Sequence, residues 1–510
     1  MAAFILSQLT SLLRYILVLR AFGTSAEMDA FYVANQVTDT IFALAAGGAL
    51  ASSFIPTFTG LLAKGEKQAA WQLASAIANL ILVVVTILGG LAAVFAPFIV
   101  SNILARGYAG NPAQLSLTVD LIRLMMPAVV IFGLSGLVMG ILNSHQVFLI
   151  PALTPSMYSL GLIFGATALS GLGIYGLGWG VLIGAALHLA LQLPTLMRQG
   201  GRYFPILGLH LPSVQEVGRL FGPRLFGVGI LHLNFWVNVT LATNQPDGSV
   251  TGIKSAVALM LMPQAAIAQS IATAAMPTLS AQFARGKLDE VRASLAASLR
   301  GVLLLSIPAS LGLMLLRRPL IVLIYERGAF DARSTDLVSW ALLWYAAGLV
   351  GHSVVEILAR AYYAMHDTRT PVLVGAAAMT LNILFSIVFS ALFWRIGWAP
   401  HGGLALANSV ATALEMVGLI LLMRKKLTSL EGRNILQTVI KAGLAALLMS
   451  AGLWAWLVYT NDLPVWGVVL GGLVFGGGIY GLAVLSLGVP EAKSLLNVFI
   501  RRLNLLVSRR

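Results

Sequence analysis

Apolar runs of about 20 residues follow one another along nearly the whole chain, and each is long enough to cross a hydrocarbon core of roughly 30 Å as a helix. Because helices satisfy their own backbone hydrogen bonds in lipid, this pattern predicts an all-α, polytopic membrane protein. About fourteen spans are expected, at residues 2–22, 29–59, 69–101, 114–142, 149–170, 174–196, 219–243, 249–281, 294–324, 334–364, 370–394, 400–423, 434–459 and 464–487.

Composition supports a membrane protein and narrows its chemistry. The 510 residues are 58% apolar and only 10% charged, whereas a soluble domain carries about 25% charged residues. The absence of cysteine excludes disulfides and thiolate metal sites. No Walker loop, HExxH motif, metal-ligand cluster or nucleophile elbow occurs. We therefore expect no catalytic residues, no metal and no cofactor, and a secondary transporter in place of an enzyme.

The formal net charge of +14 is distributed unevenly among the loops. The loops after even-numbered spans, together with the C-terminal tail, hold 19 basic residues, and the opposite side holds six. By the positive-inside rule, both termini are cytoplasmic, and the excess charge reflects topology and not nucleic-acid binding. Residues 201–218 are predicted to form an amphipathic cytoplasmic linker, and residues 490–510 a basic interfacial tail.

An internal repeat divides most of the chain into two similar parts. The stretch IPTFTGLLAKGE, which contains Pro56, matches MPTLSAQFARGK, which contains Pro277, at an offset of 221 residues. Further on, His145 aligns with His366. An even number of spans in each copy predicts two parallel six-helix repeats, which is a plan used by alternating-access transporters. The expected parts are an N-terminal lobe at 1–200, a C-terminal lobe at 219–425 and two extra helices at 426–489.

A few charged residues lie where hydrocarbon is expected. Arg14 lies six residues inside Arg20, so Arg14 is the deeper charge, and Arg20 can reach the interface. A central charge costs roughly 2.5–3.5 kcal/mol on insertion scales, so Arg14 should face a wet cavity or a partner. The structural alternative is an ion pair with Asp39. Lys254 on the eighth span occupies the equivalent region of the second copy, where snorkelling to the interface is the alternative.

Four stretches resemble one family of membrane proteins. RAFGTSAEMDAFYVA, FIPTFTGLLAKGE, GILNSHQVFLIPAL and YYAMHDTRTPVLV are similar to the MurJ (MviN) lipid II flippases of the multidrug/oligosaccharidyl-lipid/polysaccharide exporter superfamily. The resemblance implies export of undecaprenyl-pyrophosphate-linked peptidoglycan precursor from the inner to the outer leaflet of the bacterial inner membrane, for cell-wall synthesis. It also implies that the last two spans form a groove for the lipid tail.

The resemblance extends to individual residues only in part. Arg14 matches a cavity arginine of the family, and Asp29 matches its aspartate at the outer end of the second span. A later arginine pair of the family falls at Phe42 and Ala43 in this chain. An arginine of the eighth span falls near Ala258, and the acidic sodium site of some members is not evident on the eleventh span.

The charged residues and the resemblance together predict a substrate-binding set of Arg14, Asp29, Asp39 and Lys254. Lys254 is one helical turn from Ala258 on the same face, so it is expected to replace part of the missing positive charge. Asp29 can also act as a cap or gate at the first turn of its helix. The expected partners are lipid II and membrane lipids, with no nucleic acid, and the expected oligomeric state is a monomer.

Alternative functions remain open at this stage. A flippase for another lipid-linked oligosaccharide and a multidrug exporter of the same superfamily share the predicted fold. A membrane glycosyltransferase would need a catalytic carboxylate and a large outer loop, and a non-transporting scaffold would move no substrate.

Overall fold

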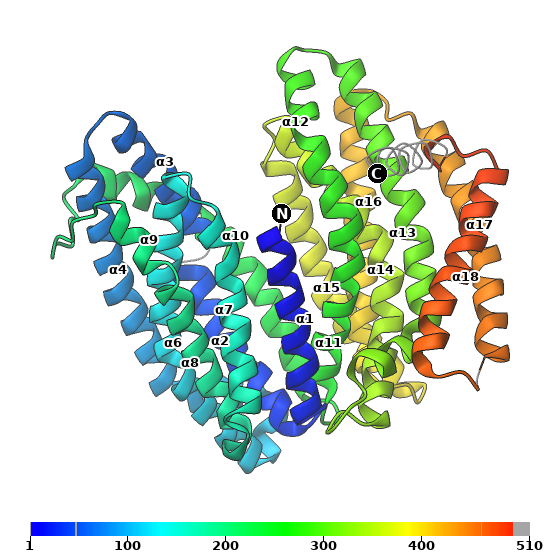
Figure 1. Cartoon of the computed structure of the whole chain (residues 1–510), viewed down its shortest axis with the longest axis horizontal. Helices are drawn as coiled ribbons and strands as arrows, with labels where there is room; N and C mark the ends of the chain where they lie inside the picture. The colour runs from blue at the N-terminus through cyan, green and yellow to red at the C-terminus, as the bar shows by residue number, and fades with distance from the viewer. Residues whose placement is uncertain (1, 46–47, 461, 493–510) are drawn as a thin grey trace, which may run out of the picture. The chain divides into compact units, whose positions relative to one another are not determined.

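The computed structural model describes residues 2–45, 48–460 and 462–492, and all regular structure within these ranges is helical (Figure 1). The chain folds as two compact units. Unit 1 contains Met1–Thr251 and Arg327–Ser334, and unit 2 contains Gly252–Glu326 and Thr335–Arg510. Eleven helical segments of the described residues are long and apolar enough to cross a membrane. The protein is therefore a multi-span helical membrane protein.

Unit 1 contains the helices of the first six predicted spans and the helix of the seventh. Its helices are α1 (Ala2–Phe22), α2 (Ala26–Ala45), α3 (Gly48–Ala63), α4 (Lys67–Val94), α5 (Ala96–Phe98), α6 (Pro112–Ser144), α7 (Leu149–Thr167), α8 (Ile174–Ala190), α9 (Leu193–Arg198) and α10 (Pro212–Thr243). The eleven span candidates do not include α1, α2, α3 or α10. Polar residues such as Asn35 and Asp39 lower the hydropathy of α2.

Helix α10 begins earlier than the periodicity predicts. The expected linker ended at residue 218, but the helix starts at Pro212, where a proline at the first position needs no hydrogen-bond donor. The compact units also divide the chain after Thr251, and not in the region 201–218, because α10 packs against α2 and α3 of unit 1.

Small residues bring α7 and α8 into close contact. A Cβ atom built on Gly161 would lie 2.3 Å from the Gly184 Cα, and one on Gly165 would lie 2.4 Å from the Gly176 carbonyl oxygen. Both distances are shorter than van der Waals contact, so only glycine fits at these crossings. Close approach of this kind drives helix association in the membrane, because moving an apolar side chain from lipid into a helix contact gains little free energy by itself.

Unit 2 contains the remaining predicted spans. Its helices are α11 (Ser249–Gln264), α12 (Ser270–Ala284), α13 (Leu288–Tyr325), α14 (Ala332–Ala364), α15 (Arg369–Arg395), α16 (His401–Leu427), α17 (Gly432–Tyr459) and α18 (Val465–Ser486), with the first residues of α11 and α14 lying in unit 1. A π-helical turn at Ala265–Gln269 joins α11 to α12 and begins two residues after Pro263. The eighth predicted span is therefore one helical segment with an irregular turn, and proline explains the irregularity because it lacks an N–H group.

The last two helices pack on α13 (Figure 1). Arg300 of α13 forms ion pairs with Glu431, directly before α17, and with Glu491, shortly after α18. The Arg300–Glu431 distance is 3.0 Å, and the Arg300 side chain is 18% exposed. Arg300 thus attaches both ends of the helix pair to α13. The basic tail predicted at 490–510 lies almost entirely outside the described residues.

Two pairs of helix-ending turns share their backbone geometry across the proposed repeat. Gly65 and Gly286 are left-handed, with φ of 79° and 70°, and lie 221 residues apart, as aligned. In the second pair, the left-handed residues are Gln146 and His366, with φ of 59° and 57°. The alignment of His145 with His366 is therefore wrong by one residue at this turn, because His366 occupies the backbone position of Gln146.

The α7–α8 contact predicts the effect of one added methyl group. We expect Gly165→Ala to destabilise the protein by about 1–3 kcal/mol, because the new Cβ would overlap the Gly176 carbonyl. Thermal denaturation of the detergent-solubilised protein, followed by size-exclusion chromatography, would measure this loss. Gly171→Ala is the matched control, since a Cβ there meets nothing within 4 Å. Equal stability of both variants would contradict the close packing.

Candidate functional site

Arg14 lies half-buried on α1 between two aromatic rings. Its guanidinium carbon is 4.6 Å from the centroid of the Tyr15 ring and 5.7 Å from that of the Tyr158 ring on α7. Cation–π contacts of this kind contribute roughly 0.5–2 kcal/mol and do not neutralise the charge. The ion pairs of the described residues do not include one of Arg14.

Asp39 lies near the same aromatic residue. Its exposed carboxylate, on α2, accepts a hydrogen bond of 2.9 Å from Asn35 Nδ2 one turn earlier. Tyr158 is within electrostatic range of both Asp39 and Arg14. The structure thus groups Arg14, Tyr158 and Asp39 in unit 1. Sequence reasoning missed Tyr158, because one tyrosine within an apolar run carries no signal of its own.

A second set of polar contacts joins α2 to α10. Thr40 Oγ1 lies 3.0 Å from His232 Nδ1, and it accepts a hydrogen bond of 2.8 Å from Trp236 Nε1. Directly after this region, Phe42 packs against Phe132 of α6, with ring centroids 5.6 Å apart. The place where the family has an arginine is therefore part of an aromatic contact in this protein.

Asp29 lies on the first turn of α2 and is only 3% exposed. Its Oδ2 accepts a hydrogen bond of 2.8 Å from the Gly248 N–H. Its Oδ1 accepts bonds of 2.7 Å from the Thr251 N–H and 2.6 Å from the Thr251 hydroxyl. Asp29 therefore caps the beginning of α11, and both of its oxygens are occupied by protein donors. The sequence suggested a cap at the first turn of Asp29's own helix, α2, whereas the carboxylate bonds to the beginning of α11.

Lys254 lies half-buried on α11 and belongs to unit 2. Arg14, Asp29 and Asp39 all belong to unit 1. The geometry within unit 1 therefore groups three of the four predicted site residues in one compact unit, with Asp29 in a capping position and Arg14 and Asp39 near Tyr158.

The remaining motif residues stabilise turns. Asp367 follows α14, accepts a hydrogen bond from the Thr370 N–H at 3.1 Å and pairs with Lys426 at 2.7 Å. The hydrogen bond from Lys426 is the main reason that the pKa of Asp367 falls to about 2.

In the eleventh predicted span, Thr380 bonds to the backbone of its own helix, and Asn382 is buried. No group of three or more possible metal ligands occurs among the described residues.

Known proteins resemble this chain over nearly its full length. The family model described as "Lipid II flippase MurJ" matches residues 18–470. A lipid II flippase MurJ of Burkholderia cenocepacia is 30% identical over 467 residues, which cover 90% of this chain and 89% of the relative.

Two solved structures share the fold. The structure of a lipid II flippase MurJ in an inward closed conformation superposes with a TM-score of 0.81 at 24% identity, covering 94% of this chain and 97% of that one. An inward-facing multidrug resistance MATE family transporter of the MOP superfamily gives a TM-score of 0.65 at 14% identity, covering 84% and 96%.

The Asp29 geometry predicts a loss of stability on removal of its charge. We expect Asp29→Asn to destabilise the protein by about 1–3 kcal/mol. The Asn side chain has one acceptor oxygen and a donor NH2 group, so it cannot accept hydrogen bonds at both positions as the carboxylate does. Glu27→Gln is the control, since Glu27 lies on the same helical turn but is exposed. Thermal unfolding in detergent would measure both variants. A fully stable Asp29→Asn protein would show that the cap contributes nothing.

Proposed function

Because the chain belongs to the lipid II flippase MurJ family, we propose that it moves lipid II, the undecaprenyl-pyrophosphate-linked peptidoglycan precursor, from the inner to the outer leaflet of the bacterial inner membrane. The observation that carries this proposal is the family match over residues 18–470. The chain is thus a transporter of a non-enzymatic family. The fourteen-span layout, two parallel six-helix lobes, cytoplasmic termini and a monomeric state are parts of the same proposal.

Arg14 is the central element of the proposed mechanism. A lipid-linked sugar cannot cross unaided, because each unpaired polar group costs several kcal/mol in hydrocarbon. Arg14 lacks a carboxylate partner in the described ion pairs and is held by the Tyr15 and Tyr158 rings, so its N–H groups can bind a pyrophosphate oxygen. Lys254 of α11 is the second cation that we propose for substrate binding. Asp29 acts as a cap and not as a ligand, and Asp39 limits the net charge near Tyr158.

The membrane potential supplies a direction for this cycle. An inside-negative potential assists outward movement of the anionic headgroup by roughly 2.3 kcal/mol per charge per 100 mV. The same potential favours return of the empty cationic site. The two steps together amount to alternating access of the two lobes.

The tail of the substrate requires an apolar surface, and unit 2 offers one. A pocket of about 800 Å³ is lined by α13, α14, α16 and α17. Its walls are mostly aliphatic, including Ile307 and Val439, and Arg424 and Arg433 also line it. We infer that a prenyl chain lies in this pocket during transport, which gives α17 a role in the proposed lipid-tail groove.

A flippase for another lipid-linked oligosaccharide is the second candidate function. The observation that favours it is the aromatic contact of Phe42 with Phe132, since the family has an arginine at the position of Phe42. Restoration of growth in a strain depleted of its own lipid II flippase separates the two candidates, because only a lipid II flippase would restore growth.

The cation assignment predicts the behaviour of two variants in that depleted strain. We expect Arg14→Ala and Lys254→Ala each to lower lipid II export at least tenfold, since one charge-assisted hydrogen bond contributes about 1.5–3 kcal/mol. Accumulation of outer-leaflet lipid II is the measurement. Arg20→Ala is the control, because Arg20 is exposed on the same helix as Arg14. Full export by both variants, at equal amounts of protein in the membrane, would overturn the site.

The tail pocket predicts an effect of filling it. We expect Val439→Trp to lower lipid II export by roughly tenfold, because the indole ring would occupy space that the prenyl chain needs in the pocket. Ile440→Trp is the matched control, since Ile440 is the next residue and is 53% exposed. Outer-leaflet accumulation would again be measured. Equal export by the two variants would exclude this pocket as the binding surface for the tail.

A further inference from the structure

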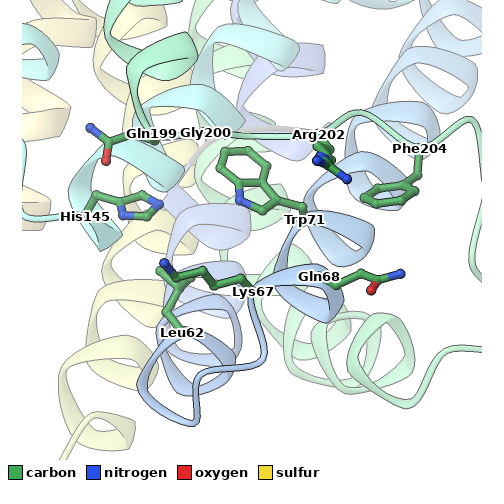
Figure 2. A pocket seen from close by; sticks show the side chains of 9 residues that line it. All are labelled: Leu62, Lys67, Gln68, Trp71, His145, Gln199, Gly200, Arg202 and Phe204. Atoms are coloured by element: carbon green, nitrogen blue, oxygen red, sulfur yellow. The ribbon is translucent and has the colours of Figure 1, made fainter.

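A polar pocket of about 650 Å³ lies in unit 1, away from Arg14, at the ends of helices that the orientation rule places on the cytoplasmic side. Figure 2 shows Lys67 and Gln68 along one side, Gln199, Gly200 and Arg202 along the other, and Trp71 and His145 between them. Leu62 and Phe204 complete the lining. The proposed transport mechanism uses none of these residues.

The charges around this pocket have one sign. Its lining contains Lys67 and Arg202 and no carboxylate. Lys67 is the first residue of α4, so its ammonium group lies at the positive end of a 28-residue helix. The nearest carboxylate in sequence, Glu66, is exposed and is not part of the lining. Two cations beside a helix N-terminus are a favourable environment for an anion.

A buried nitrogen of His145 also points to a ligand. The His145 side chain is half-buried, and its Nε2 atom exposes less than 1 Å² and has no hydrogen-bond partner in the described structure. The ring stacks on Trp71, with centroids 6.3 Å apart and an interplanar angle of 23°. Burial, together with the charge of Lys67, lowers the pKa of His145, so the ring is neutral at pH 7 and can donate one hydrogen bond.

The far side of the pocket is held in place by the chain itself. Tyr203 donates a hydrogen bond of 2.7 Å to Asn79 Oδ1, and Asn79 Nδ2 donates one of 2.8 Å to the Ile206 carbonyl. The Phe204 N–H bonds to Ser75 Oγ at 3.1 Å. A Cβ on Gly201 would lie 2.5 Å from the Trp71 ring, so the chain crosses this ring at a distance that only glycine permits. The pocket is thus preorganised, which lowers the entropic cost of binding.

We propose that this pocket binds a phosphate group, with Lys67 and Arg202 pairing with its oxygens and His145 donating a hydrogen bond. Arginine suits this ligand because its planar fork matches two phosphate oxygens. The aromatic rings of Trp71 and Phe204 contact the molecule that carries the phosphate. This assignment goes beyond the proposed transport function, since it adds an anion site that is separate from Arg14.

Two sources could supply the phosphate. One is a soluble phosphate ester, and the other is the headgroup of a membrane lipid. An apolar pocket of about 290 Å³ shares Trp71 and Arg202 with the polar pocket and is lined by Leu134, Leu193 and other aliphatic residues. An acyl chain would fit in this adjoining space, so the test needs a soluble arm and a lipid arm.

The test uses the full chain in uncharged detergent micelles. Inorganic phosphate and glycerol 3-phosphate form the soluble arm, measured by isothermal titration calorimetry, and short-chain phosphatidylglycerol forms the lipid arm, measured by native mass spectrometry. We expect the double variant Lys67→Gln/Arg202→Gln to bind its ligand at least tenfold more weakly than the unchanged protein, in whichever arm holds the natural type of phosphate compound. His145→Phe keeps a ring for stacking but removes both nitrogens, and we expect it to weaken binding by about two- to tenfold.

Two control variants separate the site from general charge. Lys64→Gln/Arg198→Gln removes the same charge from exposed residues outside the lining, and we expect it to leave affinity unchanged within about twofold. Lys67→Arg/Arg202→Lys keeps both charges and should retain binding. Site-dependent binding in the lipid arm alone would identify a lipid headgroup, and in the soluble arm a free phosphate ester. The absence of binding in both arms, or equal loss in the Lys64/Arg198 control, would overturn the proposal.

Discussion

The hydrogen bonds that the Asp29 carboxylate accepts are the interaction on which the organisation of unit 1 most depends. Hydrocarbon offers no hydrogen-bond partner, so a buried charge persists only where the protein supplies donors. Asp29 receives three such donors from Gly248 and Thr251, which are 219 and 222 residues away in the sequence. One carboxylate therefore connects the start of α2 with the turn that follows α10. With that turn held, α10 remains packed on α2 and α3, and the polar residues of α2 keep their partners on α10.

Two arginines, Arg300 and Arg14, lie in apolar runs of the sequence but have different neighbours in the structure. Arg300 meets two carboxylates, so its charge is used to attach the ends of the last helix pair to α13. Arg14 meets two aromatic rings, which stabilise a cation without neutralising it. The charge of Arg300 is balanced by carboxylates, whereas no carboxylate of the described ion pairs balances that of Arg14. Both residues interrupt apolar runs in the sequence, and only their neighbours in space distinguish them.

The sequence predicted several helices to within a few residues, such as 334–364 for α14, but the stretch 69–101 contains α4, α5 and a π-helical turn in place of one helix. It missed the first turns of α10, since the amphipathic stretch before residue 219 also suits a surface linker. The 221-residue offset aligned His145 with His366, but the left-handed residue of the first turn is Gln146, so the backbone register differs by one residue there. At the candidate site, the sequence pointed to Arg14 and Asp39 but not to Tyr158, and it listed Asp29 among the substrate ligands, whereas both Asp29 oxygens are bonded to protein donors.

By itself, the sequence determined that this is an all-helical membrane protein, because hydropathy and the need to satisfy backbone groups in lipid act on each segment separately. It also determined the family, through motifs that are local in the chain. Tertiary structure decided which charges are neutralised, which polar atoms lack partners and which glycines must stay small. Those properties depend on residues far apart in sequence, as with Asp29 and Thr251 or Gly161 and Gly184. The physical reason is that the cost of a buried charge or methyl group is set by its neighbours within a few ångströms, and folding brings those neighbours from distant parts of the chain.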